Sequence, residues 1–338
     1  MEYVFGPVPS RRLGQSLGID PVPAKTCNWN CVYCQLGRTI PLTHERRSFF
    51  PRQAILDELQ QALAQAPAGT IDWITFVGSG ETTLSSDLGW LIYQAKRLSN
   101  LPLAVITNGS LLYLPEVRRD LAWADAVLPS LDAGTPELYR KLNRPHPEAT
   151  FERLVEGLVE FRQMYRGKLW LELMLLKGIN DDETALRQIA NHVQRIRPDE
   201  VHINLPTRPP AESWVEPAND EGIMRAVAIL GDVARVVHPA DGSFNLGGCS
   251  TVLEAIAAII TRHPMRQAEL EHALARWAPG QIQEALHQLQ ESGRAKVVER
   301  LGDQFWSAPA AYFPNATESL ATAPNAVRPR PGEPAAPR

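Results

Sequence analysis

The chain lacks several features that would assign it to common classes of protein. It has no apolar run approaching the roughly 20 residues that cross a bilayer, and its N-terminus has no basic segment followed by an apolar run. Basic residues are not in excess, since the formal charge is −4. A P-loop, a G-x-G-x-x-G fingerprint and a recognisable Ser-His-Asp arrangement are also missing. We therefore expect a cytoplasmic protein that binds no membrane, with DNA binding disfavoured.

Cysteine is scarce, and its distribution is uneven. The 338 residues contain four cysteines, too few to staple a chain of this length through disulfides. Three of them, Cys27, Cys31 and Cys34, fall in the segment CNWNCVYC. This C-x3-C-x2-C spacing can bring three thiolates to one inorganic centre and leave one position of that centre open. A structural zinc site is the alternative, and it would need a fourth ligand such as His44 or Cys249.

The length predicts about two domains. From residue 16 to residue 238, short β-branched or apolar runs alternate with longer amphipathic stretches, which is typical of repeated β-α units on a parallel sheet. The predicted strands are 16–20, 72–77, 103–107, 126–131, 169–176 and 201–205, and the predicted helices between them are 51–66, 87–99, 114–123, 150–165 and 181–196. The pattern predicts an α/β fold, a partial (β/α)6 TIM-like barrel, with functional groups at the carboxyl ends of the strands.

The cysteine segment carries a family resemblance. CNWNCVYC resembles the cluster-binding loop of the radical S-adenosylmethionine (SAM) superfamily, and the surrounding GPVPSRRLGQSLGIDPVPAKTCNWNCVYCQLGRT resembles iron–sulfur oxidoreductases related to the wyosine tRNA-modifying enzymes. The resemblance covers roughly residues 5–240. It implies that Cys27, Cys31 and Cys34 hold a [4Fe–4S] cluster whose fourth iron is chelated by SAM. Tyr33, just before the last cysteine, also fits the family pattern and is a candidate cofactor-binding residue.

The turn after the second predicted strand, GSGETTL, resembles the glycine-rich segment that holds the SAM amino group in the superfamily. The resemblance makes cofactor-binding candidates of Gly78, Ser79, Gly80, Glu81 and Thr82. Ser79 departs from the family, where a second glycine is common at this place. Glycines in such a turn let the backbone approach a bound group closely, although a short glycine turn is also an ordinary loop.

Polar residues follow the next strands as well. Asn108 lies in a turn after the third strand, and Ser130 and Asp132 lie two residues apart after the fourth, on one face of the chain. A hydroxyl and a carboxylate together suit a ribose diol, and similar positions in the superfamily contact SAM. Asn204, at the end of the sixth strand, resembles the region that cradles adenine. The alternative for each of them is an ordinary turn or strand-end polar group.

The ends of the last two strands supply further candidates for the cavity. Lys177, Asn180 and Asp181 follow the fifth strand, and Arg208 follows the sixth. Asn180 and Asp181 have the alternative role of capping the next helix, which we favour for Asp181. The guanidinium of Arg208 suits a substrate carboxylate or phosphate, and a surface salt bridge is its alternative role.

The sequence after the barrel restarts with new helical patterns. We predict a radical SAM core domain over residues 1–240, a linker over 241–250, a winged-helix-like domain over 251–308 and a disordered tail over 309–338, rich in proline and alanine. The winged helix is expected from three helical patterns followed by a hairpin. Its third helix has no Lys or Arg before Arg294, so we favour contact with a protein or presentation of substrate over duplex binding.

The fourth cysteine and the overall function complete the expectations. Cys249 is a linker thiol, a cluster ligand or a hydrogen-atom donor, and we favour the linker thiol. The resemblance implies an oxidoreductase or transferase that reductively cleaves SAM to a 5′-deoxyadenosyl radical, which abstracts hydrogen from a substrate, RNA and protein included. Flavodoxin or ferredoxin would supply the electron. The alternatives are a tRNA-modifying radical SAM enzyme and a non-enzymatic metal or iron–sulfur sensor that binds DNA through the winged helix.

Overall fold

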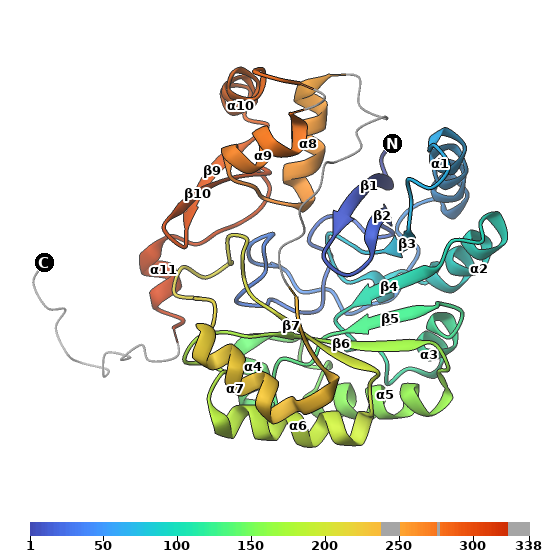
Figure 1. The fold of residues 1–338 in the computed structure, drawn as a ribbon, viewed down its shortest axis with the longest axis vertical. Helices are drawn as coiled ribbons and strands as arrows, with labels where there is room; N and C mark the ends of the chain where they lie inside the picture. The colour runs from blue at the N-terminus through green and yellow to red at the C-terminus, as the bar shows by residue number, and fades with distance from the viewer. Residues whose placement is uncertain (238–250, 276–277, 324–338) are drawn as a thin grey trace, which may run out of the picture.

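The computed structural model describes residues 1–237, 251–275 and 278–323. Their largest element is a curved sheet with strands in sequence order, β1 antiparallel to β2 and all later neighbours parallel (Figure 1). The strands are β1 Val4–Ser10, β2 Gly14–Ile19, β3 Trp73–Phe76, β4 Leu103–Thr107, β5 Ala126–Pro129, β6 Lys168–Met174, β7 Glu200–Asn204 and β8 Ala234–Val236. The sheet confirms the parallel α/β class.

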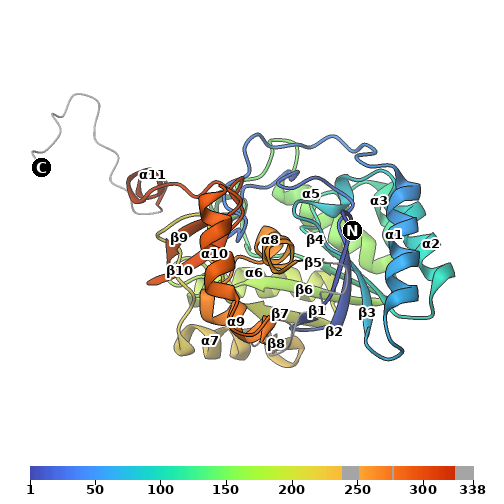
Figure 2. The same cartoon turned by 90° about the horizontal axis from the view of Figure 1, so that it is seen from above.

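Helices cover the outer face of this sheet, as the view in Figure 2 shows. They are α1 Arg52–Gln65, α2 Leu88–Leu98, α3 Pro115–Leu121, α4 Pro136–Leu142, α5 Phe151–Met164, α6 Glu183–Ile196 and α7 Asp220–Leu230, with short 3-10 turns η1 Thr82–Leu84 and η2 Gly231–Val233. N-terminal caps fix several starts: Thr150 Oγ1 accepts from Arg153 N at 3.3 Å and Asp182 Oδ1 from Ala185 N at 3.0 Å. Each such cap contributes about 1 kcal/mol. None of the described helices is long and apolar enough to cross a membrane.

All six predicted strands are present, and two more flank them. β1 escapes the sequence pattern because Pro7 and Pro9 interrupt it and because it pairs antiparallel at the edge of the sheet. β8 is only three residues long. The predicted count of six strands is therefore corrected to eight, and helices α4 and α7 are likewise additional to the prediction.

A C-terminal module, residues 251–275 and 278–307, has its own hydrophobic core beside the barrel. It comprises α8 Val252–Arg262, α9 Gln267–Leu274, α10 Ile282–Glu291, β9 Lys296–Arg300 and β10 Asp303–Ser307. Thr251 caps α8 by accepting from Glu254 N at 3.2 Å. The backbone of Met265 also pairs with that of Trp306. The predicted three helices and hairpin are present, and their assignment as a winged helix stays a prediction.

The end of the chain differs from the expectation of a disordered tail over 309–338. Residues 311–322, here called the C-terminal strap, pack against the barrel and include α11 Ala316–Leu320. The strap is held by backbone and polar contacts, for example Arg38 N to Tyr312 O at 2.7 Å, which a composition poor in large apolar residues does not reveal. Residues 324–338 and the predicted linker 241–250, with Cys249, lie outside the described residues.

Candidate active site

The three clustered cysteines lie in the loop after β2, at the carboxyl end of that strand. They face a cavity of about 210 Å³ whose opposite wall is the turn after β3. The cavity is lined by Phe5, Lys25, Cys27, Trp29, Cys31, Cys34, Gln35, Leu36, Thr39, Val77, Gly78, Ser79, Gly80, Arg262 and His263. The barrel, the cysteine loop (residues 25–39) and the C-terminal module all contribute to it.

Burial controls the ionisation of the thiols. It raises the pKa of Cys27 to about 12, with the negative charge of Glu81 adding to the effect. It also raises the pKa of Cys31 far above the usual range, and the neighbouring Cys27 and Cys34 thiols add to that shift. These thiols are therefore neutral at pH 7 without a metal. A bound metal centre supplies the positive charge that converts such thiols to thiolate ligands.

Groups next to the cysteines in the chain approach two of the sulfur atoms. Trp29 N lies 3.4 Å from Cys27 Sγ, and Lys25 Nζ lies 3.3 Å from Cys34 Sγ. The same ammonium group donates to Gly37 O at 2.7 Å, which ties it to the far end of the cysteine loop. N–H donors to sulfur stabilise thiolate ligands and tune the reduction potential of iron–sulfur clusters.

Two amides from distant parts of the barrel do the same for Cys27 and Cys31. Asn108 Nδ2 lies 3.8 Å from Cys27 Sγ and donates to Asn28 Oδ1 at 2.7 Å. Asn143 Nδ2 lies 3.7 Å from Cys31 Sγ. Each of the three sulfurs thus has a nitrogen donor beside it, and the cavity is equipped to stabilise negative charge on sulfur.

The residues present fit an iron–sulfur cluster. Among the described residues, no three His, Cys, Asp or Glu side chains are grouped to hold a single metal ion. In a cluster each cysteine binds a different iron atom, so no such compact group is needed. His44, the nearest alternative ligand by sequence, stacks on His146 with ring centroids 4.9 Å apart. His44 is not among the residues that line the cysteine cavity.

The glycine turn forms the wall opposite the cysteines. Gly78, Ser79 and Gly80 line the cavity. Ser79 donates from its backbone N and its Oγ to Asp20 Oδ2, at 3.0 and 2.7 Å. A Cβ at Gly80 would lie only 2.0 Å from Thr26 O, so glycine alone permits this approach of the turn to the cysteine loop. The hydroxyl that replaces the usual second glycine is therefore occupied by Asp20.

Glu81 and Thr82, also predicted as cofactor contacts, hold the turn in place. The Glu81 carboxylate accepts from Thr83 N at 3.0 Å and from Asn108 N at 2.6 Å. Thr82 Oγ1 donates to Ile106 O at 2.5 Å. Neither residue is among those that line the cavity. In the structure, Glu81 and Thr82 therefore connect η1 to the end of β4.

Asp132 lies beside Tyr33 at the base of the cysteine loop. Its Oδ2 accepts from Tyr33 OH and from Asn143 Nδ2, the latter at 2.7 Å, and its Oδ1 accepts from Met174 N at 2.8 Å. Burial raises the pKa of Asp132 to about 6, although these hydrogen bonds oppose the shift. Ser130, expected beside Asp132, pairs through its backbone with β6. The carboxylate is thus committed to holding Tyr33.

Asn204 and Arg208 have protein partners at the end of β7. Asn204 Oδ1 accepts from Arg12 Nη1 at 3.2 Å. Arg208 Nη1 donates to Pro264 O at 2.9 Å and lies 3.5 Å from Glu269 Oε2. Arg208, the predicted substrate anion contact, therefore joins the barrel to the C-terminal module.

The side chains of the other candidates after β6 contact other protein groups. Lys177 pairs with Glu216 at 2.8 Å, and both side chains are exposed. Asn180 donates to two backbone carbonyls at 2.9 Å and is fully buried. Asp181 Oδ1 accepts from Gly178 N at 2.7 Å, which closes the turn.

Three polar residues at the cysteines were missed by the sequence analysis. Lys25 and Asn28 flank Cys27 and could have been found by examining the neighbours of the motif. Asn143 is 112 residues from Cys31 in the chain, and no motif marks it. Its position follows from the fold, because α4 ends there.

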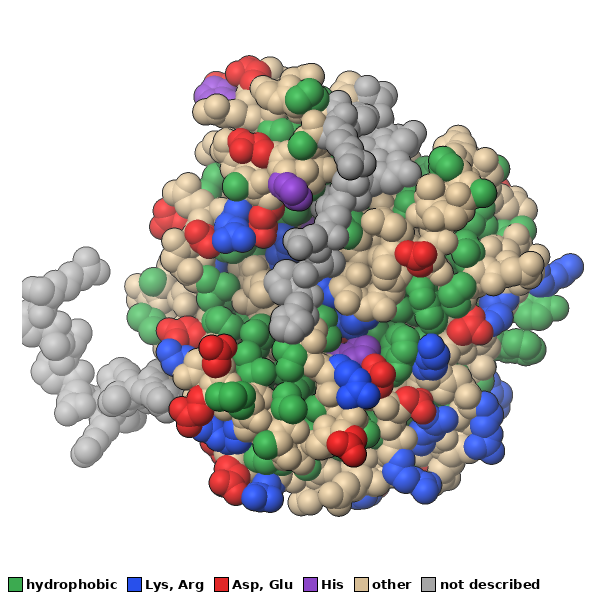
Figure 3. All heavy atoms as spheres, viewed as in Figure 1, with side chains coloured by type: hydrophobic (Ala, Val, Ile, Leu, Met, Phe, Trp, Pro, Cys, Tyr) green, Lys and Arg blue, Asp and Glu red, His purple; other side chains and the backbone are tan. Residues whose placement is uncertain are grey.

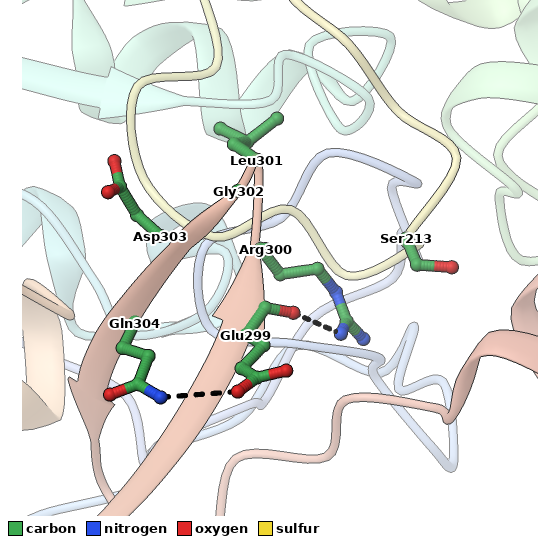
Figure 4. Close-up of a pocket in the computed structure, with 7 residues that line it drawn as sticks. All are labelled: Ser213, Glu299, Arg300, Leu301, Gly302, Asp303 and Gln304. Atoms are coloured by element: carbon green, nitrogen blue, oxygen red, sulfur yellow. Dashed lines mark hydrogen bonds between the residues drawn. The ribbon is translucent and has the colours of Figure 1, made fainter.

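A second hollow, of about 450 Å³, lies beside the hairpin of the C-terminal module (Figure 4). Its lining residues are Ser213 and 299–304, and it shares none with the cysteine cavity. Arg300 Nε donates to Pro210 O at 3.2 Å, so the hairpin is anchored there to the loop after β7. None of the predicted site residues lines this hollow.

Comparisons with known proteins identify relatives of this chain. A sequence model of the radical SAM superfamily matches residues 22–189. A UPF0026 protein of Methanocaldococcus jannaschii is 35% identical over 279 residues, which covers 81% of this chain and 86% of that protein. A Brachyspira hyodysenteriae protein named GTPase Obg is 45% identical over 223 residues, or 66% of this chain, but the chain spans only 32% of its length.

Among solved structures, that of TYW1 with a lysine-pyruvate adduct bound is similar with a TM-score of 0.48 and 16% identity, covering 64% of this chain and 72% of that one. The matched residues 22–189 contain the three cysteines and the glycine turn. The chain therefore belongs to the UPF0026 family and to the radical SAM superfamily, whose members use a [4Fe–4S] cluster and S-adenosylmethionine.

Proposed function

We propose that this protein reductively cleaves SAM and abstracts a hydrogen atom from a substrate held at the mouth of the barrel. The observation that carries the proposal is the single cavity shared by Cys27, Cys31, Cys34 and the glycine turn. When bound, the cluster and SAM supply one-electron reduction and a carbon-centred radical. The chain contributes ligation, orientation and exclusion of water.

The two walls of the cavity have different roles: the cysteine loop ligates the cluster, and the glycine turn orients SAM. Cys27, Cys31 and Cys34 are the ligands, and the nitrogen donors around them set the charge that the sulfurs can carry. Residues 78–80 line the cavity opposite the cysteines, where their backbone can approach the amino-acid part of SAM. Tyr33, fixed by Asp132, holds the cysteine loop in register with the barrel.

We expect a reducing partner such as flavodoxin or ferredoxin to supply the electron, because reductive cleavage of SAM needs one-electron reduction of the cluster. The C-terminal module serves contact with a protein or presentation of substrate. Its helix α10 carries no Lys or Arg, and on the face drawn in Figure 3 acidic and basic side chains are interspersed. A surface of this kind lacks the concentrated cations of a duplex-binding face.

Anaerobic reconstitution with iron and sulfide tests the proposal. We expect the ultraviolet-visible and electron paramagnetic resonance signals of a [4Fe–4S] cluster, a spectral change on SAM addition, and 5′-deoxyadenosine formation under dithionite. Serine at position 27, 31 or 34 should abolish all three. Cys249→Ser, the matched control, should retain them. Stoichiometric zinc in anoxically purified protein, or tight salt-sensitive duplex binding without SAM cleavage, would overturn the proposal in favour of a sensor.

A further inference from the structure

The cysteine cavity is completed by the end of α8, which belongs to the C-terminal module. Arg262, the last residue of α8, and His263 line the cavity together with the cysteines. Gln35, within the cysteine loop, donates to Arg262 O at 2.8 Å, and the Arg262 guanidinium lies 4.4 Å from the centre of the Phe5 ring. In Figure 2, α8 lies over the middle of the barrel. A ligand in this cavity would therefore meet both parts of the chain.

Arginine side chains gather where the module meets the barrel, and three of them have carboxylate partners. The pairs are Arg12 with Glu172, Arg208 with Glu269 at 3.5 Å, and Arg262 with Asp20 at 3.5 Å. Because Arg208 also donates to the backbone beside His263, these pairs surround one seam between the β1–β2 hairpin, the loop after β7 and the end of α8.

Arg11 is the exception at this seam. Its Nη2 donates to Thr207 Oγ1, and it forms no ion pair with any described residue. Burial lowers the pKa of Arg11, and the positive charges of Arg208 and Arg12 lower it further. Arginine nevertheless remains protonated in proteins. The seam thus holds one guanidinium that forms no ion pair with a described carboxylate, although Glu172 and Glu269 lie near enough to favour its charged form.

His263 adds a polar group without adding a charge. Burial, followed by the positive charges of Arg208, Arg262 and Arg11, lowers the pKa of His263 to about 3. Its ring is therefore neutral at pH 7. Arg11 donates to Thr207, and the next residue, Arg208, donates to Pro264 O, directly after His263, so Arg11 and His263 lie along the same seam.

The balance of charge at the seam favours an anionic ligand. A partly buried charge without a partner is costly, and the cost is relieved when an opposite charge with good hydrogen bonds arrives. The planar fork of arginine binds a carboxylate or a phosphate through two parallel hydrogen bonds. The seam lies between two packed parts of the chain, so it suits a small group more than a polymer.

We propose that Arg11 and Arg262 bind the carboxylate or phosphate of a small-molecule substrate and so direct the rest of that molecule into the cysteine cavity, which Arg262 lines and of which Arg11 is not a lining residue. This inference rests on the proposed radical function, because it names the substrate class of the same site. It also assigns the C-terminal module a binding role: the site is incomplete without the end of α8.

The test measures anion binding separately from SAM chemistry. The full chain, reconstituted with its cluster and saturated with SAM, is titrated calorimetrically with pyrophosphate and with malonate. We expect at least one to bind, and we expect Arg11→Gln to weaken that binding tenfold or more. Arg11→Lys, which keeps the charge but loses the fork, should give an intermediate loss. Arg187→Gln, on the exposed face of α6, is the matched control and should bind like the wild type.

The two probes distinguish the sources: preference for pyrophosphate indicates a phosphate-bearing substrate, and preference for malonate a carboxylate. The thermal unfolding midpoint of the wild-type protein is measured as well, with sodium chloride at matched ionic strength as the control. If neither probe binds the wild-type protein or raises this midpoint more than sodium chloride does, the inference is wrong, whether or not the variants fold. It is also wrong if Arg11→Gln weakens SAM itself tenfold in equilibrium dialysis, or if Arg11 is needed only for an RNA oligonucleotide. Anion binding through Arg11 without 5′-deoxyadenosine formation would instead contradict the radical function alone.

Discussion

At the scale of single residues, Asn143 connects the cysteines to the rest of the barrel. Its side-chain Nδ2 lies 3.7 Å from Cys31 Sγ, 3.1 Å from Tyr33 OH and 2.7 Å from Asp132 Oδ2. One buried amide therefore contacts a cysteine sulfur, a phenol hydroxyl and a carboxylate at once. Removing it takes away the side-chain donor beside the Cys31 sulfur and one of the three hydrogen-bond donors to Asp132.

Asn143→Ala is expected to make the cluster harder to reduce, because a donor to the Cys31 sulfur stabilises the more negative reduced state. It should also lower the free energy of unfolding by about 1–3 kcal/mol, since Asp132 loses a buried hydrogen-bond donor. A redox titration followed by electron paramagnetic resonance, with chemical denaturation, measures both effects. Asn191→Ala, on the exposed surface of α6, should change neither quantity. An unchanged potential in Asn143→Ala would show that the amide does not tune the sulfur.

At the scale of elements, one carboxylate joins the cysteine loop to the C-terminal strap. Glu212 is fully buried and accepts from Arg38 at 2.8 and 2.9 Å, from Arg144, and from Ser319 Oγ at 2.8 Å. A Cβ at Gly37, whose φ is +76°, would lie 2.2 Å from Tyr312 O, so glycine allows the strap to pair directly with the loop. The strap is thereby part of the cysteine loop's support.

Glu212→Gln is expected to lower the free energy of unfolding by about 3 kcal/mol, because the change leaves Arg38 and Arg144 without their charged partner. Limited proteolysis should then cut the strap sooner than in the wild type. Glu216→Gln is the matched control: its partner Lys177 is exposed, so the cost should stay below about 1 kcal/mol. Equal losses in the two variants would contradict a structural role for the buried pair.

The pKa of Glu212 predicts how the stability of the protein depends on pH. Burial opposes ionisation of Glu212, but hydrogen bonds and charge from Arg38 and Arg144 outweigh it and lower its pKa below the ordinary 4.5. The folded state therefore gains stability that is complete above pH 4.5 and is lost as the pH falls through the lowered value. The difference in unfolding free energy between wild type and Glu212→Gln should be constant at pH 6–8 and shrink below about 4.5. If the difference in unfolding free energy increased below pH 4.5, the pKa of Glu212 in the folded state would not be lowered.

At the scale of the whole molecule, the barrel and the C-terminal module have separate hydrophobic cores. Their contacts in the described residues include polar bonds, such as Arg208 to Pro264 O at 2.9 Å and Arg300 to Pro210 O at 3.2 Å. Such a seam favours partly independent opening of the module.

Leu286→Ala is expected to destabilise the module by about 2–5 kcal/mol, because this α10 side chain is 1% exposed and its removal leaves a cavity. Hydrogen exchange followed by mass spectrometry should show faster exchange over residues 252–307 while the barrel strands keep their protection. Leu158 on α5 is also buried, and Leu158→Ala should instead speed hydrogen exchange in the barrel while residues 252–307 keep their protection. Uniform loss of protection in both variants would mean that the two cores unfold as one.

Much of the architecture could be predicted from the sequence because its signals are local. The β-α alternation placed six strands, and the spacing of Cys27, Cys31 and Cys34 marked the loop that lines the cavity. Other features depend on residues distant in the chain. Asn143 reaches Cys31 across 112 residues, and Gln35 reaches Arg262 across 227. No periodicity encodes such meetings, so the protein partners of Asp132 and Arg208 could not be predicted, and their expected contacts with a ribose and a substrate stay predictions.

The position of the C-terminal strap in the sequence determines when its contacts with the cysteine loop can form during synthesis. Ser319 and Tyr312 leave the ribosome long after the cysteines that their segment supports. During synthesis the cysteine loop lacks these partners, so the contacts of Arg38 and Glu212 with the strap can form only after nearly all the described residues have been made.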